Sequence, residues 1–142
     1  MLNLSDVTQA LVDKLNTQLV KKTLGIEAVE FGDVNIVAKT PTVCFIPEDI
    51  THTPTASFML AEDEPLIYIV IYHGKLESAR VLLKECIKFA EAIRDQVLLD
   101  KTLGGLITTS WISKMEGGIG QSGDDLLLAT RMTWNGKART QY

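Results

Sequence analysis

The sequence is poor in the residues that build metal centres and disulfide frameworks, with two cysteines and two histidines among 142 residues. Cys44 and Cys86 lie in apolar surroundings far apart in the chain, so we expect two buried thiols rather than a disulfide. His52 and His73 have no cysteine or histidine neighbours at the spacing that zinc ligands use. The sequence therefore predicts no metal site and no cofactor.

Long apolar runs and an excess of positive charge are also missing. The longest purely apolar run, Leu66 to Tyr72, is far shorter than the roughly 20 residues of a membrane span. The N-terminus lacks the basic and then apolar layout of a signal peptide. The net charge of −4 and the pI near 5.1 argue against a protein that grips phosphate backbones. We expect a cytosolic chain, with neither a membrane nor nucleic acid as its main partner.

Apolar spacing predicts two long helices. Val7, Leu11 and Leu15 recur at helical intervals, which indicates an amphipathic helix over about residues 5–22. A similar stripe over residues 76–99 indicates a second, longer helix. With 46% hydrophobic residues, the chain can bury a core as a single domain, 1–142.

The remaining apolar runs are short and β-rich, and turn residues separate them. They are Ile26 to Phe31, Val34 to Ala38, Thr42 to Ile46, Ala56 to Ala61, Leu66 to Tyr72, Leu106 to Met115 and Leu126 to Asn135. Gly32-Asp33 is expected to turn a hairpin between the first two of these runs, and the acidic stretch Glu62 to Pro65 is expected to be a turn before Leu66. The expected fold is α+β: a mainly antiparallel sheet with two long helices packed on it, in the order helix, strands, helix, two strands.

Three segments are expected to be loops or a free end. Gly118 to Gly123 matches G-x-G-x-x-G, but a strand follows it rather than the helix that a dinucleotide site requires. We interpret residues 116–125 as a mobile hairpin tip and Pro47 to Pro54 as a second mobile loop. Residues 136–142 carry Lys137 and Arg139 and no acid, which predicts a short basic arm on an acidic protein.

No arrangement of residues indicates catalysis. The acid pairs Glu48-Asp49 and Asp124-Asp125, like the acids from Glu62 to Glu64, fall in expected loops, where solvated turns are the usual explanation. Trp111 and Trp134 are more typical of a core than of a ligand platform. We expect a protein that is not an enzyme.

Two stretches carry a resemblance to a known family. Leu98 to Gly105, with the sequence LLDKTLGG, closes the second expected helix, and Leu126 to Trp134 reads LLLATRMTW. Together with the order of the elements, they resemble bacteriophage tail terminator proteins, also called tail completion or head-to-tail joining proteins. The Val34 to Ala38 run and the acidic turn at Glu62 to Glu64 have no counterpart in that family.

The resemblance implies a structural virion protein of the tail or neck, assembled in the host cytoplasm. Its subunits would form a hexameric ring that caps the tail tube protein and meets the head connector or neck protein. DNA would pass through such a ring without sequence-specific binding. The family offers no catalytic residues and no cofactor to transfer.

Ring contacts join one face of a subunit to a different face of its neighbour. We therefore expect the contacts to use charged residues and the face of the Leu66 to Tyr72 strand that does not carry the isoleucines. The candidate interaction residues are Glu62, Asp63, Glu64, Tyr68, Tyr72, Asp124, Asp125, Arg131, Lys137, Arg139 and Tyr142. The alternative is a small adaptor or ligand-binding α+β domain without catalysis. An adaptor needs only an exposed strand edge, whereas a ligand site needs a pocket with convergent polar groups.

Overall fold

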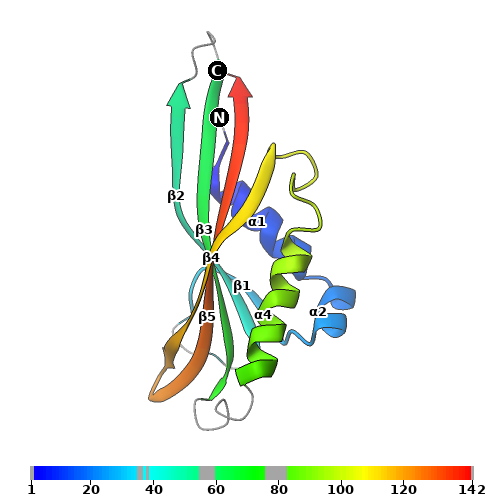
Figure 1. Ribbon diagram of the computed structural model, residues 1–142, viewed down its shortest axis with the longest axis vertical. Coiled ribbons are helices and arrows are strands. Elements are labelled where there is room, and N and C mark those ends of the chain that lie inside the picture. The colour runs from blue at the N-terminus through cyan, green and yellow to red at the C-terminus, as the bar shows by residue number, and fades with distance from the viewer. Residues whose placement is uncertain (1, 35–36, 38, 55–59, 76–82, 142) are drawn as a thin grey trace.

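The computed structural model describes residues 2–34, 37, 39–54, 60–75 and 83–141 (Figure 1). In this part of the chain, helices flank a single sheet of five strands. In chain order the elements are α1 (Leu4–Leu15), α2 (Gln18–Leu24), β1 (Ala28–Phe31), β2 (Thr42–Pro54), β3 (Leu60–Lys75), α4 (Leu83–Val97), β4 (Thr109–Ser122) and β5 (Asp125–Gln141).

The sheet is mixed, and its strand order is β1-β2-β3-β5-β4. β1 runs parallel to β2, and every other neighbouring pair is antiparallel. The four long strands twist about one another. The turn between β4 and β5 lies at the end of the sheet opposite to the C-terminal end of β2 (Figure 1). The expectation of two long helices packed on a mainly antiparallel sheet is wrong, because the described part of the chain has three shorter helices, of 12, 7 and 15 residues, and its sheet is mixed, with β1 added parallel to β2 at one edge.

The first expected helix is in fact two helices. α1 ends at Leu15, and Thr17 adopts an extended backbone with φ −111° and accepts a hydrogen bond from the Val20 N–H at 3.2 Å. A threonine in this geometry caps a new helix N-terminus, which the apolar spacing alone does not reveal. α2 buries none of its residues, and Leu19 is 77% exposed. The second expected helix is α4, which begins at Leu83, and residues 76–82 lie outside the described residues.

The hairpin expected at Gly32-Asp33, between Ile26 to Phe31 and Val34 to Ala38, is also wrong: in the described residues the sheet neighbour of β1 is β2, and the two strands are parallel. Gly32, with φ +90°, instead turns the chain away from the sheet edge. The Val37 N–H then donates to Ser122 Oγ at 2.7 Å, so this connection contacts the end of β4. Val34 and Val37 lie outside any strand, while residues 35, 36, 38 and 56–59 of two expected strands fall outside the described residues.

Four segments expected to be loops, a turn or a free arm are strand. Pro47 to Pro54 completes β2, and Glu62 to Pro65 lies within β3. The glycine-rich tip continues β4 as far as Ser122, and residues 136–141 continue β5. Turn-forming residues indicate only the local backbone preference. In these four segments, pairing with neighbouring strands determines the conformation instead.

Aromatic rings cover two of the glycines within this extended sheet. A Cβ added at Gly120 would lie 2.6 Å from the Tyr72 ring, and one at Gly136 would lie 2.7 Å from the Trp134 ring. Each ring therefore occupies the space that a side chain would need. This packing explains how glycine, a poor strand former, is accommodated in β4 and β5.

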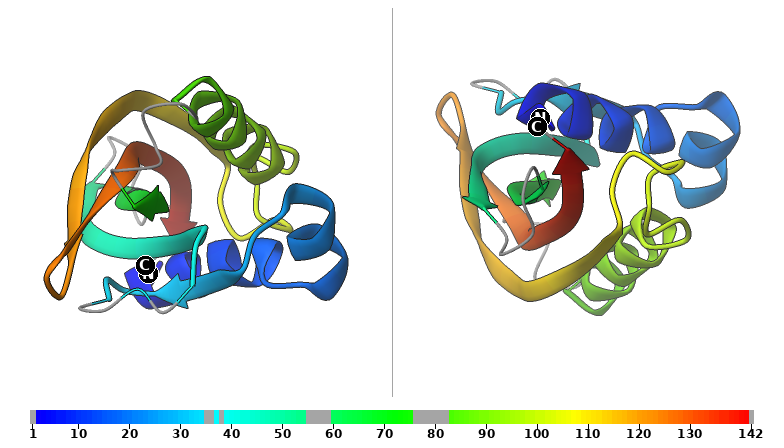
Figure 2. Two further views of the ribbon diagram at one scale, coloured as in Figure 1. Left: turned by 90° about the horizontal axis from the view of Figure 1, so that it is seen from below. Right: turned by 90° about the horizontal axis from the view of Figure 1, so that it is seen from above.

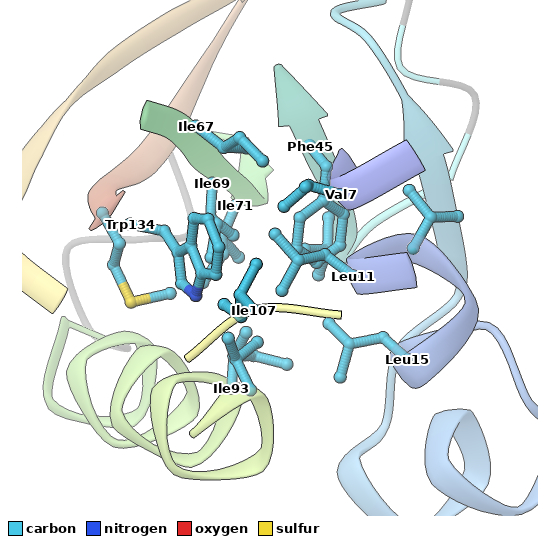
Figure 3. Close-up of a cluster of buried hydrophobic side chains, with 14 of the residues drawn as sticks. Val7, Leu11, Leu15, Phe45, Ile67, Ile69, Ile71, Ile93, Ile107 and Trp134 are labelled. Atoms are coloured by element: carbon cyan, nitrogen blue, oxygen red, sulfur yellow. The ribbon is translucent and has the colours of Figure 1, made fainter. Parts of the chain in front are cut away.

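The core lies between one face of the sheet and helices α1 and α4 (Figure 3). Ile67, Ile69 and Ile71 of β3 project into it, which confirms that Leu66 to Tyr72 is a central, buried strand. Trp134 is fully buried there, as expected for a core residue. Trp111 is 43% exposed, so the same expectation for Trp111 is wrong.

Lys14 of α1 ties the two core helices together. Its Nζ donates to the carbonyl oxygens of Val97 at 2.9 Å and Asp100 at 2.8 Å, at the end of α4. The Asp100 carboxylate accepts from the backbone N–H groups of Thr102 and Gly104, which shapes the turn within the stretch LLDKTLGG.

Candidate interaction surface

In the described residues, the helices pack on one face of the sheet, and we call the opposite face the outer face. Strand side chains alternate between the two faces, so Tyr68 and Tyr72 of β3 project outward while the isoleucines between them project into the core. Figure 2 shows the helices on one side of the long axis and the tip of the β4–β5 hairpin on the other. The outer face therefore presents side chains of β2, β3, β5 and β4.

A charged cluster occupies the middle of the outer face. Arg131 Nη2 donates to Glu116 Oε1 at 2.7 Å, and Lys114 Nζ lies 3.4 Å from Glu116 Oε2. The Arg131 guanidinium also lies over the Tyr68 ring, 4.7 Å from its centroid. The hydrogen bond from Arg131 is the main cause that holds the pKa of Glu116 below its usual range. The cluster therefore holds two basic side chains and one carboxylate in fixed positions beside the Tyr68 ring.

A second charged cluster lies further along β3 and β5. The register places Glu62 opposite Arg139. The Glu62 carboxylate forms ion pairs with Lys137, at 3.5 Å from Oε2 to Nζ, and with Arg139, at 3.6 Å from Oε1 to Nε. The sheet thus brings together three of the expected interaction residues that are far apart in sequence. Lys137 and Arg139 belong to a paired strand rather than to a free basic arm.

The apolar end of the outer face lies beneath the β1–β2 connection. Tyr72 donates through its hydroxyl to Asp33 Oδ1 at 2.8 Å and packs with buried Cys44. Burial raises the pKa of the Cys44 thiol to about 12, and burial also raises the pKa of Tyr72. Cys44 is therefore a packed thiol without nucleophilic character. Cys86 is only partly buried, so the expectation of a buried thiol is wrong for Cys86.

Two hollows flank the glycine-rich part of β4. On the outer face, Gly118, Gly120 and Arg131 help to line a hollow of about 300 Å³. On the helix side, Gly117, Leu128 and Ile87 help to line an apolar hollow of about 220 Å³. Because Gly117 and Gly118 have no side chains and nothing lies within 4 Å of a Cβ added at either, both faces of this part of β4 are accessible.

Asp63 differs from the other expected acidic residues, because it is buried on the helix side of the sheet. Its carboxylate lies 2.5 Å from His52 Nδ1 and accepts from the Leu2 backbone N–H at 3.1 Å. Asp63 therefore anchors the beginning of the chain to β2 and β3.

The other expected interaction residues are more scattered. Glu64 is exposed on β3, while Asp124 and Asp125 are exposed at the turn between β4 and β5. Tyr142 lies outside the described residues.

The two histidines lie in separate environments. His73 Nε2 is 2.8 Å from Thr130 Oγ1, and its ring meets Phe89 edge to face. Burial lowers the pKa of His73 from 6.5 to about 4. Among the described residues, no group of three histidine, cysteine or acidic side chains is placed to hold a metal ion. None of the helices described is both long and apolar enough to cross a membrane.

Several exposed apolar residues were not among the expected interaction residues. Phe31 at the β1 edge is 45% exposed, and Ile119 at the β4 edge is 61% exposed. Leu83 and Ile87 of α4 are each at least half exposed beside the helix-side hollow. Their apolar character is visible in the sequence, but the sheet order that puts β1 and β4 at the two edges is not.

Comparisons with known proteins identify the fold. No family model matches the chain, and no curated protein matches it in sequence. A solved structure described as "Virion of native gene transfer agent (GTA) particle" contains a chain that aligns with a TM-score of 0.59 and 14% identity. The alignment covers 94% of this chain and 94% of that chain. At this identity the similarity shows that the two chains share a fold over nearly their whole lengths.

Proposed function

We propose that this chain is a structural subunit of a phage-like virion, with an assembly role rather than an enzymatic one. The observation that carries this proposal is the shared fold over 94% of both chains with a chain of a gene transfer agent virion. Coverage of this extent means that the fold similarity is not confined to one common substructure. The proposed location is the virion, after assembly in the host cytoplasm.

The finer proposal is that the chain acts as a tail terminator. The resemblance of Leu98 to Trp134 to tail terminators supports it, and so does the ordered pattern of charge on the outer face around Arg131 and Glu62. A hexameric ring would cap the tail tube and meet the head connector or neck protein, while DNA passes through without sequence-specific contacts. Charged clusters at an interface favour correct partners and fix the register of binding more than they add affinity.

Native mass spectrometry and negative-stain electron microscopy test this function. The purified protein is measured over a range of concentrations, alone and with tail tube protein from the same virus. A six-membered ring, free or at the tube end, is the expected result. A monomer or dimer under all conditions, with no binding to tubes, would reject the ring.

A variant pair tests whether the outer face contributes to that assembly. Arg131→Glu reverses the charge that faces Glu116, whereas Lys22→Glu reverses an exposed charge on α2. The first variant should impair tube capping, and the second should leave it unchanged. Equal capping by both variants would remove the outer-face cluster from the proposal. A ligand-dependent shift in melting temperature of a monomer would favour the ligand-binding alternative.

A further inference from the structure

We infer that neighbouring subunits join edge to edge, with β1 of one copy adding to β4 of the next to continue the sheet. This inference rests on the proposed ring and names the junction within it. In the described residues, β1 and β4 are the two edges of one five-stranded sheet. A contact between two different edges is heterologous, which is the kind of contact that closes into a ring.

Strand directions favour this junction. β1 runs parallel to β2, and the three antiparallel pairings that follow leave β4 running opposite to β1. A second copy in a similar orientation therefore presents β1 antiparallel to β4. An antiparallel ladder gives the stronger pairing geometry, and main-chain hydrogen bonds along an open edge supply affinity.

The faces of the two edges also match. Phe31 pairs with buried Phe45, so its side chain lies on the helix side, while Glu30 pairs with Cys44 and lies on the outer side. On β4, Ile119 pairs with Leu128 of the helix-side hollow, and Glu116 pairs with Arg131 of the outer face. A continued sheet keeps apolar residues beside apolar ones and places Glu30 on the same face as Arg131.

One register of β1 against β4 of the next copy matches the faces of both strands. With Phe31 opposite Gly117, the aromatic side chain faces the apolar hollow of about 220 Å³. Glu30 then lies opposite Gly118, beside the outer hollow that Arg131 lines, and Val29 lies opposite Ile119. A Cβ at Gly117 or Gly118 would meet nothing within 4 Å, so the space beside the glycines is open for side chains of a neighbour.

Charge and exposure identify a second copy as the occupant. Glu30 is an exposed acid at one edge, and Arg131 and Lys114 are exposed bases at the other. Phe31, 45% exposed, offers an aromatic anchor of the size that an apolar pocket at an interface accepts. The chain thus carries both halves of the contact, at opposite edges of its own sheet.

Disulfide trapping tests the junction in the full-length protein. In a Cys44→Ala, Cys86→Ala background, which removes the thiol beside position 30 in the β1–β2 register, Glu30→Cys with Gly118→Cys should give a ladder of covalent oligomers, up to the ring, when oxidised after assembly. The matched control is Leu19→Cys with Gly118→Cys, because Leu19 is 77% exposed but lies on α2. The control should give no ladder.

A second pair of variants keeps the test independent of disulfide geometry. Phe31→Asp should raise the concentration needed for assembly about tenfold or more, because it removes the aromatic anchor. Leu19→Asp should leave that concentration unchanged, and both variants should melt near the parent. A ring that forms normally with Phe31→Asp and gives no ladder with the cysteine pair would overturn the edge junction alone. A chain that never assembles would overturn the ring and the junction together.

Discussion

Replacing Gly120 by alanine is expected to destabilise the subunit, even though alanine is ordinarily the better strand residue. The new Cβ would lie 2.6 Å from Tyr72 Cε1, well inside van der Waals contact. The ring cannot move freely, because Tyr72 is 6% exposed and its hydroxyl donates to Asp33 at 2.8 Å. Overpacking of this kind costs about 1–3 kcal/mol. For a chain of this length that loss corresponds to a fall in Tm of about 3–12 °C.

Gly118→Ala is the matched control, since Gly118 lies two residues earlier in β4 on the same face. Nothing lies within 4 Å of its added Cβ, and neither glycine has a positive φ. We expect Gly118→Ala to change stability by less than about 0.5 kcal/mol. Urea and thermal unfolding followed by circular dichroism measure both variants. In a Tyr72→Phe background, which frees the ring from Asp33, the cost of Gly120→Ala should fall. Equal stabilities of the two alanine variants would refute this packing argument.

Three further predictions concern the core, the link between the helices and the pH dependence. Ile69→Asp should unfold the protein, because a buried unpaired charge costs several kcal/mol against a total of about 5–15; a parent-like circular dichroism melt would contradict it. Lys14→Met should cost about 1–3 kcal/mol in urea unfolding by leaving two carbonyl oxygens near the end of α4 without their donor, and Lys22→Met should cost little. The folded-state pKa of His73, about 4, lies below the ordinary 6.5, so the unfolded state binds more protons between these values and stability should fall as pH drops through that window. His73→Gln should reduce this fall in Tm more than His52→Gln does, and an unchanged profile would reject the assignment to His73.

The sequence by itself identified the features that depend on local periodicity and on strongly apolar runs. Ile67, Ile69 and Ile71 alternate in a short, β-branched apolar run that predicts a buried strand, and the structure has that strand at the centre of its sheet. The apolar stripe of α4 likewise indicated a helix. These two predictions hold because burial of a continuous apolar face contributes more free energy than the local preferences of single residues.

The tertiary structure decided the length of the strands, the mixed order of the sheet and which charged side chains come together on its outer face. Residues 62–65 and 116–122 look like turns because glycine, proline and acids disfavour isolated strands. Pairing with β5 on one side, and aromatic rings over Gly120 and Gly136, outweigh that preference in the folded chain. The meeting of Glu62 with Lys137 and Arg139 follows from register over a sequence separation that no local pattern encodes. Local preferences act within a few residues, whereas strand order and register are set by contacts between distant segments, which form only when the whole sheet does.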